Sequence, residues 1–282
     1  MPIDLSVVGK ELEPLKFSYS QRDVMLYALG VGAGVQDEDL CFVYENELVA
    51  LPTYGVIPPF HALLGLAGVE GVDINLAMLL HGEQYLEVHK HPIPVEAELI
   101  SKPKIAAVYD KGKGALVEMD VETFNKDGEL VFFNKYGAFV RGEGGFGGEK
   151  GPEPGYEPPE REPDKTVSMK TLPQQALIYR LSGDYNPLHA DPSFANMVGF
   201  KKPILHGLCT FGFAARAVLK EYGNNDPNSF KAIKTRFSKN VFPGDTIVTE
   251  MWKEDNGMII FRSKTEESGD YCLTNSAIWL NN

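Results

Sequence analysis

Runs rich in strand-forming apolar residues recur near the end of each half of the chain. In the first half they are residues 99–109, 115–124 and 129–140, and in the second half residues 246–254, 258–265 and 271–280. Short polar stretches that contain glycine separate these runs, for example residues 110–114 and 255–257. Runs of this composition joined by such turns predict an antiparallel meander at the end of each half.

A helical pattern precedes the second meander. Residues 208–222 are mostly apolar and are framed by Gly207 and Gly223, which predicts a buried helix. The corresponding part of the first half is interrupted by two prolines and three glycines between residues 58 and 71, so its helix is predicted to be broken or shortened. A central helix wrapped by an antiparallel sheet in each half predicts an α+β chain with a double hot-dog architecture.

A stretch rich in glycine and proline divides the chain. Twelve of the 23 residues from 142 to 164 are Gly or Pro, which predicts a linker between residues 1–141 and 165–282. The two halves match weakly at a nearly constant offset, since Tyr27 stands 152 positions before Tyr179 and Pro94 stands 149 before Pro243. These matches suggest an internal duplication.

Composition excludes several classes of protein. Hydrophobic residues make up 43% of the 282 residues, which is typical of a globular chain. The sequence has no run of about 18 apolar residues, the length that would predict a membrane span. The N-terminus lacks the pattern of a secretory signal, so an intracellular protein is expected. Cys41, Cys209 and Cys272 form no Cys-x-x-Cys pair, which argues against a disulfide framework and a zinc site. The net charge of −12 disfavours nucleic acid as a partner.

The side chains best suited to catalysis lie in one short stretch, residues 179–189. Asp184, Asn186 and His189 surround Pro187, and Gly183 precedes them. Extended backbone would place the carboxylate and the imidazole roughly 17 Å apart, so a turn is needed to bring them together. Proline and glycine favour such a turn. A carboxylate and an imidazole that share one water are suited to hydration or dehydration, because one group takes a proton as the other gives one.

A structural interpretation of the same residues stays open. Asp184 or Asn186 would also serve as the cap of a helix that begins near Asp191. The order of the whole string favours catalysis, because it resembles the hydratase 2 signature of the MaoC-like acyl-CoA hydratases. That signature consists of an aromatic residue, Leu-Ser-Gly-Asp, a second aromatic residue, Asn-Pro-Leu-His and then a small residue.

Other segments extend this resemblance over nearly the whole chain. Residues 202–212, 80–86 and 144–148 are similar to the hydratase 2 domain of the animal-type peroxisomal multifunctional enzymes of β-oxidation. The resemblance implies reversible hydration of a trans-2-enoyl-CoA to the (3R)-3-hydroxyacyl-CoA by a homodimer. It implies no metal and no organic cofactor, since coenzyme A is part of the substrate.

The resemblance also assigns residues. It implies that Asp184 and His189 are the acid-base pair and that Asn186 helps to hold the water. The Gly207 amide is suited to stabilise the negative charge on the thioester oxygen, because the first N–H groups of a helix are unpaired. His206 is interpreted as a helix-start residue. The predicted substrate contacts are His81, Gly82, Lys111, Asp184, Tyr185, Asn186, Pro187, Leu188, His189, Gly207 and Phe237.

Further contacts are hypotheses with ordinary alternatives. Lys111 is expected to reach a coenzyme A phosphate, and Lys113, Arg236 and Lys239 are weaker candidates that would otherwise be solvated. Glu45 is interpreted as a surface carboxylate. A groove beside the broken helix, lined by residues such as Phe60, Leu63, Leu64 and Leu66, is expected to take the acyl chain; an amphipathic core segment is the alternative.

The two halves are not expected to be equivalent. At the offset of 152, Asp184 corresponds to Gly32 and His189 to Asp37, so only the second half has the catalytic pair. The family's multifunctional members also carry dehydrogenase and sterol-carrier domains, so fusion in a longer parent protein is possible. Peroxisomal location is implied by the resemblance, but the chain ends without a Ser-Lys-Leu tripeptide, which leaves a cytoplasmic location open. The alternatives to a hydratase are another hot-dog enzyme, a thioesterase or dehydratase, and a non-catalytic acyl-CoA-binding module.

Overall fold

The strands predicted at the end of each half are present. The computed structural model describes residues 3–75, 78–153 and 155–281, and each predicted strand end lies within two residues of the observed one. The first meander comprises β3 (Ala97–Asp110), β4 (Gly114–Asn125) and β5 (Leu130–Arg141), and the second comprises β8 (Thr246–Lys253), β9 (Ile259–Thr265) and β10 (Tyr271–Leu280).

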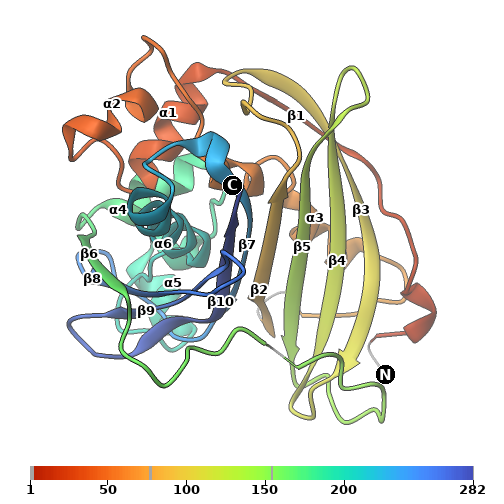
Figure 1. Cartoon of the computed structure of the whole chain (residues 1–282). Coiled ribbons are helices and arrows are strands. Elements are labelled where there is room, and N and C mark those ends of the chain that lie inside the picture. The colour runs from red at the N-terminus through yellow and green to blue at the C-terminus, as the bar shows by residue number, and fades with distance from the viewer. Residues whose placement is uncertain (1–2, 76–77, 154, 282) are drawn as a thin grey trace.

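Four further strands complete one continuous antiparallel sheet. They are β1 (Leu15–Tyr19), β2 (Leu79–Val88), β6 (Lys165–Lys170) and β7 (Phe230–Phe237). The strand order is β1-β3-β4-β5-β2-β7-β10-β9-β8-β6. From the central pair outward, the strands are β2-β5-β4-β3-β1 in the first half and β7-β10-β9-β8-β6 in the second. Each strand of one half therefore has its counterpart at the same position in the other half, as an internal duplication requires. The two predicted sheets therefore join edge to edge through the antiparallel pair of β2 and β7 (Figure 1).

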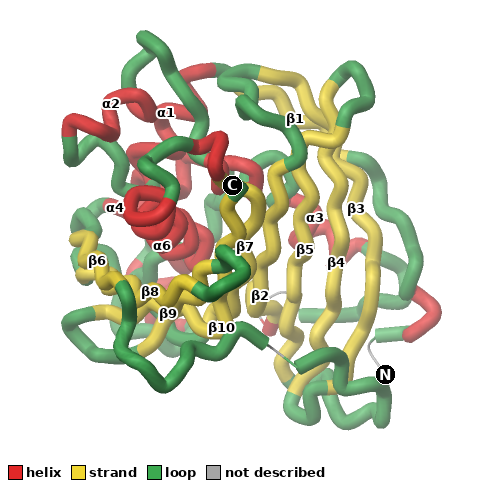
Figure 2. Tube along the Cα trace, in the orientation of Figure 1, coloured by secondary structure: helices red, strands yellow, loops and turns green. Residues whose placement is uncertain are grey.

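The second half wraps one long helix, as predicted. Helix α6 spans Gly207–Tyr222, and every residue from Leu208 to Leu219 is buried. A helix that is apolar on nearly all sides is stable only inside a core. Apart from α3 (His61–Gly65) of the first half, the other described α-helices are short and lie beside the second half (Figure 2). They are α1 (Gln21–Gly30), α2 (Leu40–Val43), α4 (Gln175–Tyr179) and α5 (Pro192–Met197).

The central helix of the first half is shortened, which confirms the prediction. The segment contains two 3₁₀ turns, Pro52–Val56 and Leu66–Gly68, and between them only the five residues of α3, His61–Gly65. The two prolines before α3 lack the N–H groups that a longer helix would need. Short α3 lies behind the strands of the first meander (Figure 1).

The first half has no room for a second catalytic pair at the corresponding position. Tyr27 and Tyr179, which the offset equates, lie 6.0 Å apart between ring centroids. Gly32 stands where the second half has Asp184, and a Cβ on Gly32 would lie 2.5 Å from the ring of Phe213. This part of the first half is therefore filled by side chains from α6.

The predicted linker connects β5 to β6. Its described residues, 142–153 and 155–164, contain no helix or strand, and Pro154 lies outside the described residues, as do 1–2, 76–77 and 282 of the predicted halves. The division into domains stays a prediction, because the sheet runs across both halves. All three cysteines are free, with Cys209 and Cys272 buried. None of the described helices has the length and apolar character needed to cross a membrane.

Candidate active site

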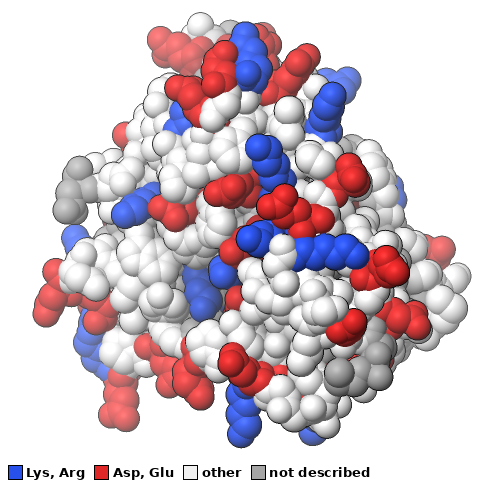
Figure 3. Space-filling model, turned by 90° about the vertical axis from the view of Figure 1, so that its right-hand side faces the viewer, with Lys and Arg blue, Asp and Glu red and all other residues white. Residues whose placement is uncertain are grey.

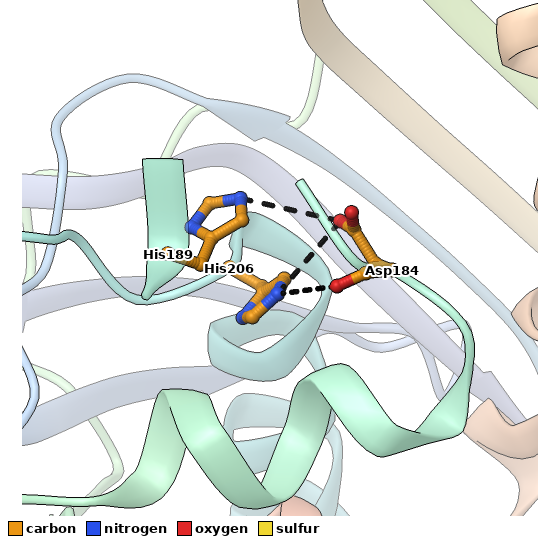
Figure 4. Close-up of side chains that lie close together, drawn as sticks. All are labelled: Asp184, His189 and His206. Atoms are coloured by element: carbon orange, nitrogen blue, oxygen red, sulfur yellow. Dashed lines mark hydrogen bonds and ion pairs between the residues drawn. The ribbon is translucent and has the colours of Figure 1, made fainter. Parts of the chain in front are cut away.

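The loop after α4 brings Asp184 and His189 together. His189 Nε2 lies 4.0 Å from Asp184 Oδ2, and His206 Nε2, just before α6, lies 3.9 Å from the same oxygen (Figure 4). The side chain of Asp184 is 21% exposed, whereas that of His206 is 2% exposed. The predicted turn therefore exists, and a third side chain joins the pair.

Local hydrogen bonds explain how the loop turns. Gly183 has φ of +130°, a conformation that favours glycine. Asp184 Oδ1 accepts a hydrogen bond from the backbone N–H of Asn186 at 3.1 Å, and Asn186 Oδ1 accepts one from the N–H of Leu188 at 3.0 Å. Asn186 thus caps the 3₁₀ turn Pro187–His189. Its side-chain NH₂ has no hydrogen-bond partner among the described residues and is free to donate to a ligand.

The capping interpretation was wrong for the helix near Asp191. Helix α5 is capped by Asp191 itself, whose Oδ1 accepts from the N–H groups of Ser193 and Phe194 at 2.8 and 3.4 Å. Asp184 is therefore not needed for that helix. Its Oδ2 faces the two histidines instead.

His206 is a site residue that the sequence interpretation missed. Its ring stacks on that of His189 with centroids 3.7 Å apart and planes inclined by 28°, and its other side meets Tyr179 at 4.9 Å. His206 Nε2 lies 3.2 Å from the main-chain oxygen of Asp184, so it donates a hydrogen bond there. One signal was present in the sequence, because histidine is not among the preferred residues at the start of a helix.

Burial keeps both histidines neutral. It lowers the pKa of His189, although the Asp184 carboxylate and the Ile204 carbonyl act in the opposite direction. Burial lowers the pKa of His206 still further, and the charge that His189 would carry adds to this effect. His189 Nδ1 lies 2.8 Å from the carbonyl oxygen of Ile204, which only accepts, so Nδ1 carries the proton and Nε2 is left as an acceptor.

The loop faces a cavity of about 1240 Å³. The cavity is lined by every predicted catalytic and substrate-binding residue except Pro187, which begins the 3₁₀ turn and is not part of the lining. Phe60, Leu63 and Leu64 also line it, whereas Leu66 is wrong as a groove residue because it is fully buried in the core. Glu45 is exposed and outside the lining, as a surface carboxylate would be.

Gly207 presents an open amide to the cavity. It is the first residue of α6, where the N–H has no partner within the helix, and it is exposed. A Cβ at this position would lie 3.0 Å from the ring of Phe237 in β7. That ring lies 4.9 Å from His81 in β2, so the wall of the cavity at the joined strands is aromatic. Burial lowers the pKa of His81 to about 4, which keeps it neutral as well.

The lining of the cavity is more basic than the chain as a whole. The lining has six Lys or Arg side chains against four Asp or Glu, whereas the whole chain has 27 against 39. The face in Figure 3 has acidic side chains across it with Lys and Arg interspersed. The basic lining residues are Lys111, Lys113, Arg141, Lys234, Arg236 and Lys239.

Asp184, His189 and His206 also form a group whose ligand atoms lie within 4.8 Å of one another. A metal site would need the lone pairs of both rings to converge on one point. The stacked rings direct them side by side, and His206 Nε2 is already bonded to the main-chain oxygen of Asp184. The arrangement therefore fits a hydrogen-bonded group of side chains better than a metal site.

Both halves of the chain match models of known protein families. Residues 17–142 match the family model described as the MFE-2 hydratase 2 N-terminal domain, and residues 155–275 match the MaoC like domain. The mouse peroxisomal multifunctional enzyme type 2 is 47% identical over 97% of this chain, which covers 38% of that enzyme. The probable enoyl-CoA hydratase 2 of Dictyostelium discoideum is 45% identical, over 97% of this chain and 95% of that protein.

Solved structures agree with the fold. A MaoC-like dehydratase from Phytophthora capsici superimposes with a TM-score of 0.87 at 37% identity, over 99% of both chains. A Mycobacterium tuberculosis protein with a double hotdog fold matches at a TM-score of 0.58 and 13% identity, which speaks for the fold alone. The predicted double hot-dog architecture is confirmed, and the chain spans about a third of the length of the multifunctional relatives.

Proposed function

We propose that this chain, which belongs to the MaoC-like hydratase 2 family, adds water to trans-2-enoyl-CoA and forms (3R)-3-hydroxyacyl-CoA. The observation that carries the proposal is the arrangement of Asp184 and His189 on one side of a long cavity, with the Gly207 amide open to the same cavity. These are the parts that the reaction needs: two acceptors for a water and a donor for the thioester oxygen.

The spacing of the pair suits one shared water. A separation of 4.0 Å between His189 Nε2 and Asp184 Oδ2 is too long for a direct hydrogen bond. A water at about 2.8 Å from both atoms donates one hydrogen to each. A lone pair of the water oxygen then points away from Asp184 and His189, toward C3 of a bound enoyl group.

His189 is the group that receives the proton. Its Nδ1–H is committed to the Ile204 carbonyl, and burial keeps the ring neutral with Nε2 as an acceptor. The water oxygen forms a bond to C3, one hydrogen stays on the new hydroxyl, and the other passes through His189 Nε2 to C2 on the same face. Asp184 holds the hydrogen that stays and stabilises the transient imidazolium.

The electrons of the double bond move onto the thioester as water attacks. The oxygen of the resulting enolate is placed at the Gly207 N–H, where the start of α6 also favours negative charge. The helix thus acts only on the charge that develops during the reaction. Collapse of the enolate collects the proton at C2 and regenerates the neutral thioester.

The two ends of the substrate suit two ends of the cavity. Lys111, Lys113 and Arg141 are basic residues of the lining and bind the phosphates of coenzyme A. The acyl chain lies against the apolar side chains beside α3, namely Phe60, Leu63 and Leu64. The cavity exceeds the usual range of about 300–1,000 Å³ for small-ligand sites, in keeping with a long thioester.

The direct test follows the loss of absorbance of trans-2-decenoyl-CoA and determines the configuration of the product. Formation of the 3R alcohol supports the proposal. Release of free coenzyme A, detected with a thiol reagent, would instead identify a thioesterase, and tight binding without turnover would identify a binding module. A 3S product would contradict the arrangement of the site.

The rate is expected to fall at acid pH only below pH 6.5. His189 must be neutral to accept a proton, and burial lowers its pKa below the ordinary value of about 6.5. Imidazolium therefore accumulates only below that pH. The measurement is kcat/KM from pH 4.5 to 8.5, and an acid limb centred above pH 6.5 would contradict a buried neutral base.

His206 is expected to act by positioning Asp184. The change His206→Leu removes the hydrogen bond to the main-chain oxygen of Asp184 and should lower kcat about fivefold, since a net hydrogen bond is worth about 1 kcal/mol. Glutamine keeps a donor of similar reach, so His206→Gln should restore most of the rate. If both variants are equally impaired while their thermal unfolding matches the parent, the hydrogen bond has no such role.

The names of the relatives support a proposal about where the reaction takes place. The mouse and Neurospora crassa relatives are named as peroxisomal, and their greater length accords with fusion to other domains. We propose that this chain acts as a homodimer in peroxisomal fatty-acid β-oxidation. Sedimentation analysis tests the dimer, and imaging of the tagged full-length protein tests the compartment.

A further inference from the structure

The glycine-rich segment after β5 packs onto the turn that carries Lys111. We call residues 144–151 the glycine strap. A Cβ on Gly144 would lie 2.5 Å from the carbonyl oxygen of Gly112 and 2.6 Å from the backbone of Gly114, so only glycine permits this approach. Gly151 lies as closely against the ring of Tyr109, where a Cβ would be 2.6 Å from the ring.

One carboxylate ties the strap to the turn. Asp110 Oδ1 accepts hydrogen bonds from the N–H groups of Gly112 and Gly145, both at 2.8 Å, and Oδ2 accepts one from Gly147 at 2.7 Å. Gly145 and Gly147 have φ of +80° and +77°, which turn their amides toward the carboxylate. The amide of Gly145 first, then that of Gly112, lowers the pKa of Asp110, so the group is ionised at neutral pH.

The strap also holds Lys111 directly. The Lys111 ammonium donates to the carbonyl oxygen of Lys150 and lies 5.7 Å from the centre of the Tyr109 ring. An ammonium has three donors, so two remain for a ligand. Lys111, Gly112 and Lys113 of the turn line the cavity, as do Pro152 and Glu153 just beyond the strap.

We propose that Asp110 and the glycine strap position Lys111 and Lys113 to bind the phosphates of the thiol carrier, and that they thereby select substrates on a phosphorylated carrier. The inference rests on the proposed hydratase function but concerns the carrier end of the site. Asp110 is outside the lining of the cavity, so it acts through the lysines as a positioning residue.

The test compares two thioesters of the same acyl chain. Asp110→Ala should raise KM for trans-2-decenoyl-CoA roughly tenfold, because charge-assisted hydrogen bonds to phosphate weaken when the lysines lose their position. Its kcat, and its kcat/KM for trans-2-decenoyl-pantetheine, which has no phosphate, should match the parent. The double variant Asp110→Ala/Lys111→Ala should bind the CoA thioester no more weakly than Lys111→Ala alone.

A matched control lies at the other end of β4. Asn125 Oδ1 accepts from the N–H groups of Asp127 and Glu129 at 3.0 and 2.9 Å, so it braces a hairpin turn in the same way but far from the cavity lining. Asn125→Ala should leave both thioesters unaffected. Should Asp110→Ala not fold, Asp110→Asn, which retains one acceptor oxygen, should show a smaller shift of the same kind.

Two results would overturn the proposal. One is an equal loss with both thioesters, which would show that Asp110 only maintains the fold. The other is an unchanged KM for the CoA thioester in a folded variant. If the parent had no hydratase activity, the proposed function would fail separately, and calorimetry with coenzyme A and pantetheine would decide the inference: equal binding of coenzyme A by parent and Asp110→Ala would refute it.

Discussion

Asp184→Asn and His189→Gln are each expected to lower kcat about 10²- to 10⁴-fold, the range that a positioned acid or base contributes. Asparagine keeps the shape of Asp184 and its hydrogen bond from Asn186, but it presents a weaker acceptor to the water. Glutamine at residue 189 removes the ring nitrogen that receives the proton. The two groups act on one water, so the double variant should be little slower than either single variant.

The control for these variants comes from the same loop. Asp191→Asn changes a carboxylate that caps α5 and lies outside the cavity lining, and asparagine caps a helix equally well. Its kcat should stay within about twofold of the parent, a ΔΔG‡ below 0.5 kcal/mol. Single-turnover rates with trans-2-decenoyl-CoA supply the comparison. An Asp184→Asn enzyme that kept more than a tenth of the parent rate would remove Asp184 from the mechanism.

Gly207→Pro is expected to lower kcat about 10²- to 10³-fold relative to Gly207→Ala, the cost of one oxyanion donor. Proline removes the N–H, and the first position of a helix tolerates proline. His206 has φ of −61° and ψ of 138°, the extended conformation that a residue before proline prefers. The backbone of the variant should therefore stay in place.

The comparison with alanine separates the lost donor from added bulk. Both substitutions introduce a Cβ that meets the ring of Phe237 at 3.0 Å, but only proline deletes the amide hydrogen. The steady-state kcat of the two variants, with circular dichroism to verify folding, measures the effect of the N–H alone. Equal rates would show that the Gly207 amide does not bind the thioester oxygen.

Local patterns predicted much of the fold. The meander strands are bounded by glycine turns, and α6 is apolar on nearly all sides, so each is encoded within its own segment. Strands β2 and β7 were not predicted, because residues such as Glu83 and Arg236 interrupt their apolar positions. Their pairing across the two halves depends on contacts about 150 residues apart in sequence, which no local pattern records.

The sequence predicted only those residues of the candidate site that lie close together along the chain. Asp184, Asn186 and His189 lie in one turn, and their spacing around Pro187 was sufficient to predict their meeting. His206 was missed, because its contact with His189 depends on where α6 begins relative to the loop. The role of residues 144–148 was also invisible, since only the folded chain places these glycines against Asp110.

The most direct measurement is the crystal structure of the Asp184→Asn variant with trans-2-decenoyl-CoA bound. The mechanism predicts the thioester oxygen about 2.7–3.1 Å from the Gly207 nitrogen. It also predicts a water that contacts both residue 184 and His189 Nε2 and faces C3 of the acyl chain. A thioester oxygen turned away from Gly207, or a C3 atom beyond reach of that water, would contradict the proposed mechanism.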